Sequence, residues 1–140
     1  IEKLSLEAAL SQSADLHEQR TGTRVERAID DLGTDLPVAV KCCLFRFSQE
    51  GLNNAFRYAG GKGQVLIARR EGEKLHVEVV DDGPGFGGRC SASIRVGLGI
   101  AGLRHRVEAL GGTFKVDASQ SGGSRLIATF DVPCMRYADV

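Results

Sequence analysis

The sequence predicts an α+β fold, a two-layer α/β sandwich in which helices cover one face of a mostly antiparallel sheet. Two observations indicate it: the strand patterns arrive in neighbouring pairs, and the helical patterns are kept apart from these pairs along the chain. A chain of 140 residues, 42% of them hydrophobic, can bury one core of its own and not comfortably two. We therefore expect one domain that covers residues 1–140.

Two helical patterns and one strand pattern fill the first part of the chain. Apolar residues recur with a helical period over residues 4–20, and Thr21-Gly22 ends the pattern. Residues 23–29 contain β-branched side chains and are expected to form a strand. A longer helix is predicted over residues 35–59, with a proline tolerated in its first turn and a glycine-rich stretch after it.

Two strand pairs flank a third helix in the rest of the chain. Residues 64–70 and 74–80 alternate between apolar and polar side chains and are predicted to form a hairpin. Residues 82–99 are glycine-rich and irregular, which is typical of a lid. A helix is expected next, ended by Gly111-Gly112, with strands at 113–119 and 124–132 after it. The apolar face of this helix is formed by Ile100, Leu103, Val107 and Leu110.

The composition argues against several classes of protein. The 18 basic and 18 acidic side chains cancel, so no overall positive field exists to gather nucleic acid or anionic lipid. No stretch approaches 18 uninterrupted apolar residues, and charged residues among the first ten argue against a signal peptide. The four cysteines lack metal-ligand spacing and are expected to be reduced thiols in the cytoplasm. Because the chain begins inside a helical pattern, we expect it to be part of a longer protein.

The long predicted helix carries a polar stripe. Glu50, Asn54, Arg57 and Tyr58 stand at i, i+4, i+7 and i+8, so a carboxylate, an amide, a guanidinium and a phenol share one side. Most such stripes are only solvated, and this stripe alone would not indicate a site. The opposite stripe is expected to face the sheet. It is formed by Phe45, Leu52, Phe56 and Ala59.

Two glycine-rich segments add to this stripe. Asp81 follows directly on a predicted strand, and Gly83 and Gly85 would let the backbone approach a flat ligand whose amino hydrogens the carboxylate accepts. Taken alone, this segment could equally be a Pro-Gly turn. Residues 97–102 open a helix with spaced glycines, where free N–H groups and the positive helix end can meet phosphate oxygens. The segment lacks the βαβ unit of a Rossmann site, and the sequence has no P-loop motif.

In this order, the three segments resemble the boxes of the ATP-binding domain of histidine kinases, a relative of the ATPase domains of gyrase, Hsp90 and MutL. Residues 49–59 (QEGLNNAFRYA) are similar to the N box, residues 81–86 (DDGPGF) to the G1 box and residues 97–104 (GLGIAGLR) to the G2 box. The continuation at residues 106–112 (RVEALGG) is typical of the subfamily of nitrate sensors and the membrane-fluidity sensor DesK. The resemblance implies the Bergerat-type ATP-binding fold and covers nearly the whole chain.

The resemblance also implies the residues that handle the phosphates. Glu50 would hydrogen-bond and activate the acceptor imidazole, Asn54 would coordinate a Mg²⁺ ion that bridges the phosphates, and Arg57 would touch phosphate. The lid positions that fold over the phosphates would be Gly97, Leu98 and Gly99.

A second group of residues would bind the base of ATP. Asp81 would accept the adenine amino group as the main specificity contact, and the hydroxyl of Ser124 would assist it. Tyr58 would lie against the adenine, and Gly83 and Gly85 would leave room for it.

The implied activity is phosphoryl transfer from ATP to a histidine nitrogen, which depends mostly on positioning and charge neutralisation. His17 lies in the first helix, which resembles the linker into the domain, and is expected to be an ordinary surface or half-buried residue. His76 and His105 are expected to face outward. The acceptor is therefore expected on an absent dimerisation domain upstream of Ile1, so this fragment would bind ATP without phosphorylating itself. It is expected to be monomeric, whereas the full protein, with or without a membrane anchor, would be a homodimer that passes phosphate to a response regulator.

Two other functions fit the same fold. One is an anti-sigma-factor-type serine kinase, whose acceptor lies on a separate protein, and the continuation after the G2 box argues against it. The other is a degenerate module that binds nucleotide only to regulate partner contacts. The presence of Glu50, Asn54 and Asp81 argues against this second function.

Overall fold

The computed structural model describes residues 4–82, 100–118 and 123–132. Its helices are α1 (Leu6–Thr21), α2 (Val38–Ala59) and α4 (Ala101–Ala109). Its strands are β1 (Glu26–Ile29), β2 (Val65–Glu71), β3 (Lys74–Asp81), β4 (Thr113–Ala118) and β5 (Ser124–Asp131).

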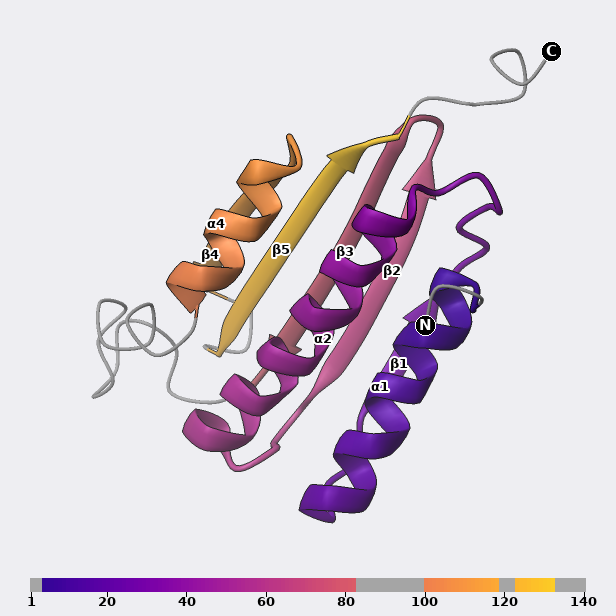
Figure 1. The fold of residues 1–140 in the computed structure, drawn as a ribbon. Helices are drawn as coiled ribbons and strands as arrows, with labels where there is room; N and C mark the ends of the chain where they lie inside the picture. The colour runs from indigo at the N-terminus through magenta and orange to yellow at the C-terminus, as the bar shows by residue number, and fades with distance from the viewer. Residues whose placement is uncertain (1–3, 83–99, 119–122, 133–140) are drawn as a thin grey trace, which may run out of the picture.

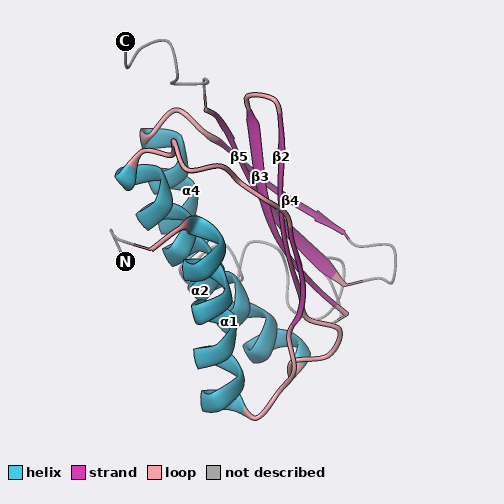
Figure 2. Cartoon of the chain, turned by 90° about the vertical axis from the view of Figure 1, so that its right-hand side faces the viewer, coloured by secondary structure: helices cyan, strands magenta, loops and turns pink. Residues whose placement is uncertain are grey.

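The described strands form one sheet with the order β1-β2-β3-β5-β4, and the described helices cover one of its faces (Figures 1 and 2). β1 pairs with β2 in parallel, and the other neighbouring pairs are antiparallel. These observations confirm the predicted two-layer α+β fold with a mostly antiparallel sheet.

Local capping explains where the first helix begins and ends. The hydroxyl of Ser5 accepts a hydrogen bond from the backbone N–H of Ala8, and Gly22 ends the helix with a positive φ of 71°. The following strand begins at Glu26 and is shorter than the predicted 23–29. The backbone just before this strand bonds to a side chain of α1 and not to β2. The N–H of Val25 donates to Glu18 Oε2 at 2.8 Å.

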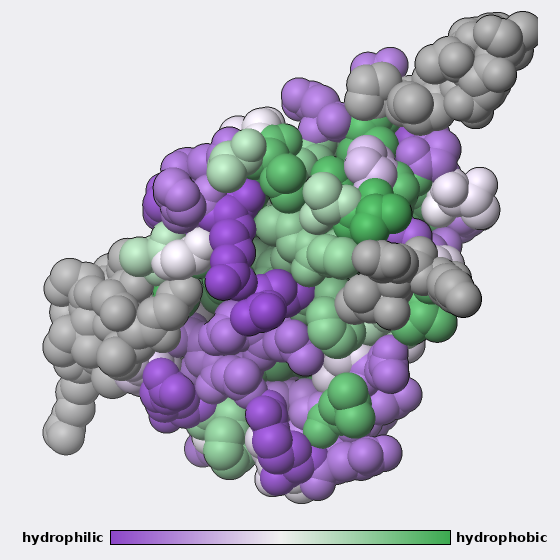
Figure 3. All heavy atoms as spheres, in the orientation of Figure 1, coloured by the Kyte–Doolittle hydropathy of each residue, from purple (hydrophilic) through white to green (hydrophobic). Residues whose placement is uncertain are grey.

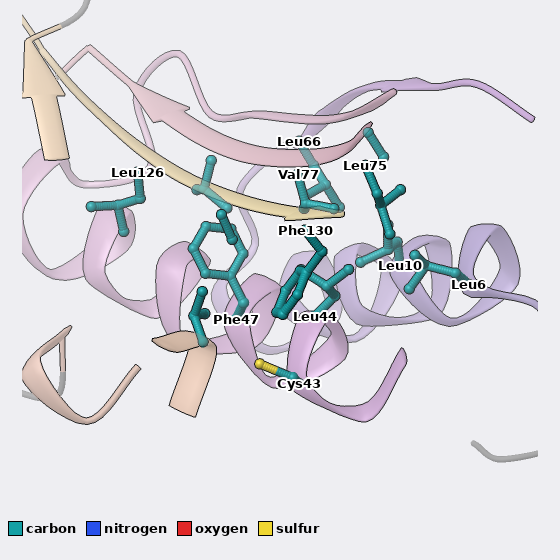
Figure 4. Close-up of a cluster of buried hydrophobic side chains, with 14 of the residues drawn as sticks. Leu6, Leu10, Cys43, Leu44, Phe47, Leu66, Leu75, Val77, Leu126 and Phe130 are labelled. Atoms are coloured by element: carbon teal, nitrogen blue, oxygen red, sulfur yellow. The ribbon is translucent and has the colours of Figure 1, made fainter. Parts of the chain in front are cut away.

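The core lies between α2 and the central strands, and Figure 4 shows Phe47 and Leu44 of α2 directed toward it. The predicted sheet-facing stripe of α2 is partly wrong. Leu52 and Ala59 are buried, but Phe45 is half-buried and Phe56 is 41% exposed. The buried arc is centred on a different side of the helix, and Phe45 and Phe56 lie beyond its edge. This arc contains Val40, Leu44, Phe47, Gly51 and Ala55.

The third helix packs as its pattern predicted, except at its end. Ile100, Leu103 and Val107 are buried, whereas Leu110 is 42% exposed. α4 ends at Ala109, and Gly111 then turns the chain with a φ of 83°, so Leu110 no longer follows the helical face.

Candidate functional site

The polar stripe lies on the half of α2 that passes over the end of β3; both elements run downward in Figure 1. A Cβ built on Gly51 would lie only 2.8 Å from Cγ2 of Val79, so glycine permits a close approach of helix and strand. Val79 and Asp81 are buried and, at i and i+2 of a strand, point to the same face of the sheet. The turn of α2 with Glu50 and Asn54 therefore lies over the strand end with Asp81.

Asp81 and Ser124 form a buried pair where β3 ends and β5 begins. They are direct partners in the antiparallel register. The Ser124 hydroxyl donates to Asp81 Oδ2 at 2.6 Å, and the Ser124 backbone N–H donates to Oδ1 at 3.3 Å. Gly123 is required before this pair, since a Cβ there would lie 1.7 Å from the carbonyl oxygen of Asp81. The carboxylate is thus held in one orientation, as a base-recognising acceptor needs to be.

Asn54 is buried, although the sequence placed it on a stripe facing away from the sheet. Its Nδ2 has no hydrogen-bond partner among the described residues. A half-turn of the amide exchanges its oxygen and nitrogen, so this position suits a carbonyl ligand to a cation or an N–H donor to phosphate. No group of three or more His, Cys, Asp or Glu side chains in the described part of the chain could hold a metal ion. One amide ligand nevertheless fits Mg²⁺, which keeps several waters and takes phosphate oxygens.

The remaining stripe residues have different surroundings. Arg57 is exposed and Tyr58 is half-buried. Glu50 is half-buried and lines a groove of about 560 Å³ between α1 and α2 that contains neither Asn54 nor Asp81. Glu50, the predicted proton acceptor, therefore faces a groove beside α1. Asp81, the carboxylate predicted to bind adenine, does not line this groove. The other predicted ligand-binding positions lie outside the described residues: Gly83, Gly85, Gly97, Leu98 and Gly99.

His17 is 3% exposed, so the prediction of a surface or half-buried histidine is wrong. Its Nε2 lies 2.8 Å from Oε1 of Gln64, and Gln64 Nε2 in turn donates to the carbonyl oxygen of Arg24 at 3.0 Å. Burial lowers the pKa of His17, and this effect outweighs the hydrogen bond to Gln64, which acts in the opposite direction. Periodicity missed this site because Gln64 is 47 residues away in the sequence.

The other histidines match their predicted surroundings. His105 is exposed, and His76 lies on the open face of the sheet beside Thr129. Cys42 and Cys43 are free thiols within α2, and Cys43 is buried. Cys90 and Cys134 lie outside the described residues.

The helical face of the molecule has a polar and a less polar part. Figure 3 shows hydrophilic side chains gathered over its lower half, where Figure 1 places the C-terminal turns of α1 and α2. Toward the N-terminal end of α2, a groove between α2 and α4 contains Ala39, Cys42, Ala109 and Leu110. No described helix has the length and apolar content that crossing a bilayer needs.

Comparisons with known proteins agree with this geometry. The family of histidine kinase-, DNA gyrase B-, and HSP90-like ATPases matches residues 43–134. The signal transduction histidine-protein kinase/phosphatase UhpB of Salmonella typhimurium is 32% identical over 111 residues, which are 79% of this chain and 21% of UhpB. The sensor histidine kinase MctS of Rhizobium johnstonii is 31% identical over 125 residues, which are 87% of this chain and 27% of MctS.

Among solved structures, the blue-light activated histidine kinase of Erythrobacter litoralis EL346 matches with a TM-score of 0.71 and 26% identity, over 92% of this chain and 46% of that one. The fold and the site thus define an ATP-binding domain of the two-layer sandwich type. The chain belongs to the family of histidine kinase-, DNA gyrase B-, and HSP90-like ATPases. This confirms the predicted family and its nucleotide. The narrower resemblance to nitrate sensors and DesK stays a prediction, and the chain spans only 21% and 27% of the two curated relatives named above.

Proposed function

We propose that this chain is the catalytic domain of a sensor histidine kinase, which binds Mg-ATP and transfers the γ-phosphate to a histidine on a dimerisation domain outside the chain. The observation that supports it best is the buried Asp81–Ser124 pair beneath the turn of α2 that carries Glu50 and Asn54. The kinases UhpB and MctS are similar to most of this chain, which favours this function over other ATPases of the family.

In this proposal, the base of ATP is recognised by Asp81. Its oriented carboxylate accepts a hydrogen from the adenine amino group, and the two bonds from Ser124 keep it from rotating. Tyr58 supplies a half-buried ring against the base. Gly83 and Gly85 would leave the backbone room to approach the ring, as the resemblance implies.

The phosphates are held on the other side of this pocket. Asn54 would hold Mg²⁺ together with phosphate oxygens, and such an ion would supply neutralising charge for the transferring group. Arg57 lies one helical turn further along α2 and is exposed, so its guanidinium can reach phosphate oxygens. Backbone N–H groups of Gly97, Leu98 and Gly99 would complete this contact.

Glu50 prepares the attacking histidine. An imidazole with the ordinary pKa of about 6.5 already has one free nitrogen at neutral pH. The Glu50 carboxylate accepts a hydrogen bond from the N–H of the other nitrogen and so orients the ring. The carboxylate then takes this proton as the new N–P bond forms. The bond between the γ-phosphorus and its bridging oxygen breaks, and ADP leaves.

The proposed partners follow from this activity. The dimerisation domain supplies the acceptor histidine and makes the complete protein a homodimer, and a response regulator receives the phosphate. No nucleic acid takes part, because the charges of the chain cancel. The domain works in the cytoplasm.

Calorimetric titration of Mg-ATP into the chain tests the nucleotide site. We expect Asp81→Asn to weaken binding on the order of 10- to 100-fold, because the amide presents N–H where the adenine amino group needs an acceptor. Asp131→Asn is the matched control, since it makes the same chemical change at an exposed strand end. Equal affinity of the parent and Asp81→Asn would contradict the site.

Transfer is tested with a histidine-bearing dimerisation domain added to the chain. The parent is expected to phosphorylate a histidine, and Glu50→Gln is expected to bind ATP normally but to transfer slowly. Phosphate on a serine would instead identify a serine kinase, and binding without any transfer would identify a regulatory module.

A further inference from the structure

Arg20, at the C-terminal end of α1, reaches across to α2. Its Nη2 donates to Oδ1 of Asn53 and lies 3.1 Å from Nδ1 of His17. Asn53 lies three residues after Glu50, and both side chains line the groove between α1 and α2. One guanidinium thus joins the end of α1 to the wall of the groove on which Glu50 stands.

The protonation of His17 follows from its partners. A guanidinium only donates hydrogen bonds, so Nδ1 of His17 is the acceptor and carries no proton. Nε2 then carries the proton and donates to Gln64 Oε1. This neutral tautomer agrees with the lowered pKa of the buried ring.

This arrangement gives Arg20 a rigid support. His17 and Gln64 are almost fully buried, and Gln64 is tied to the backbone at Arg24 and to the hydroxyl of Thr23. The guanidinium therefore rests on a fixed ring, and less side-chain freedom is lost when it bonds to Asn53.

We propose that Arg20 is a positioning residue for Glu50, acting through Asn53 to fix the turn of α2 that presents the Glu50 carboxylate to the acceptor imidazole. This inference rests on the proposed kinase function. Because Arg20 belongs to α1, the same contact makes the position of α1 a determinant of the transfer step. Nucleotide binding depends on Asp81 and Ser124, at the β3–β5 side of the site, and is independent of Arg20.

Arg27 provides a matched control. It also lies next to α1, but among the described residues its guanidinium bonds only within the α1–β1 region, to Asp15, Glu18 and the carbonyl oxygen of Ser11. Leu6, Leu10 and Ala14 keep α1 packed in the core without Arg27, so Arg27→Gln is expected to leave the position of α1 and the contact to Asn53 in place.

The experiment measures ATP affinity and the rate of transfer to an added histidine-bearing dimerisation domain at saturating Mg-ATP. We expect Arg20→Gln and Asn53→Leu each to lower the transfer rate on the order of tenfold, because a small displacement of a reacting group is enough to slow transfer. The affinity for ATP is expected to stay that of the parent. The double variant should be no slower than either single variant, since both remove the same contact.

Rescue distinguishes positioning from general packing. Asn53→Asp keeps an oxygen acceptor for Arg20 and should retain most of the parent rate. An equal loss of rate in Arg27→Gln, or an equal loss in Asn53→Asp and Asn53→Leu, would overturn the proposal. So would a weakened ATP affinity in Arg20→Gln.

Failure of the proposed function itself is recognised separately. If the parent transfers nothing, the inference is decided by hydrogen exchange of the backbone amides of residues 50–54. Faster exchange in Arg20→Gln but not in Arg27→Gln supports the positioning contact. Unchanged exchange in both variants overturns it.

Discussion

At the scale of single residues, the site depends on a carboxylate that burial would penalise without partners. Asp81 is 3% exposed and accepts two hydrogen bonds from Ser124. Hydrogen bonds to a charged group are stronger than neutral ones, and losing one leaves part of the desolvation cost uncompensated.

We expect Ser124→Ala to lower the free energy of unfolding by about 1–3 kcal/mol and to weaken ATP binding, because the Asp81 carboxylate loses its hydroxyl partner. Ser124→Thr keeps the hydroxyl and should retain both properties. Chemical denaturation and calorimetric titration measure the two effects. Parent-like behaviour of Ser124→Ala would show that the hydroxyl does not support Asp81.

His17 makes the stability of the protein depend on pH. Its folded-state pKa is lowered by burial, while the unfolded chain has the ordinary value of about 6.5. The unfolded state therefore binds more protons below about pH 6.5, and stability falls as the pH drops from there toward the lowered folded-state pKa. Well above pH 6.5 both states are neutral at this residue and no loss occurs.

We expect the difference in unfolding free energy between the parent and His17→Gln to shrink as the pH is lowered from 7.5 to 5, since the variant has no group to protonate at this position. Urea denaturation at a series of pH values measures it. Titrating carboxylates change the stability of both proteins alike and do not alter the difference between them. Parallel curves of unfolding free energy against pH would show that His17 does not cause the pH dependence.

At the scale of elements, the close approach of α2 to β3 holds the two halves of the site together. Gly51 is the contact point, and Val79 below it is 2% exposed. Glycine normally destabilises a helix interior by about 1 kcal/mol relative to alanine, so its presence here reflects packing.

We predict that Gly51→Ala lowers the free energy of unfolding by about 1 kcal/mol, because overpacking costs about 1–3 kcal/mol and exceeds the gain in helix propensity. It should also weaken ATP binding, since α2 shifts relative to Asp81. Gly102→Ala in α4 is the control: a Cβ there meets nothing within 4 Å, and the change should not destabilise the fold. A stabilised Gly51→Ala variant would contradict the close approach.

At the scale of the whole molecule, the described surface offers little for self-association. Its large exposed apolar side chains lie before α1, in α1, near the two ends of α2 and after α4: Leu4, Leu16, Val38, Phe56 and Leu110. On the open face of the sheet, the ion pair between Arg125 and Glu78 places charge among the apolar residues. A stable interface usually buries more than about 1,000 Å² with good fit.

We therefore expect the chain to sediment as a monomer at micromolar concentration, with and without Mg-ATP. Analytical ultracentrifugation measures this directly. A stable dimer would place the dimer contact within this domain and contradict its assignment to a separate dimerisation domain.

Much of the fold could be predicted because its signals are local. Helical period, strand alternation and glycine turns each involve residues close in sequence, so the element order and most boundaries followed from them. The ordered motifs around Asn54, Asp81 and Gly97 were sufficient to indicate the family. Local patterns failed at Phe56, because an apolar residue type does not show which side of a helix faces the sheet: its side chain lies outside the buried arc of α2 and is 41% exposed.

By itself, the sequence determined the class of protein and the chemical groups at its site, because both depend on residue type and order. The resemblance already predicted that Ser124 assists Asp81, but only the tertiary structure decided which other groups meet: His17 on Gln64 across 47 positions, and Arg20 on Asn53 across 33. The burial of His17 was decided in the same way. Such contacts arise when separate helices and strands pack into two layers, and no spacing within one element records them.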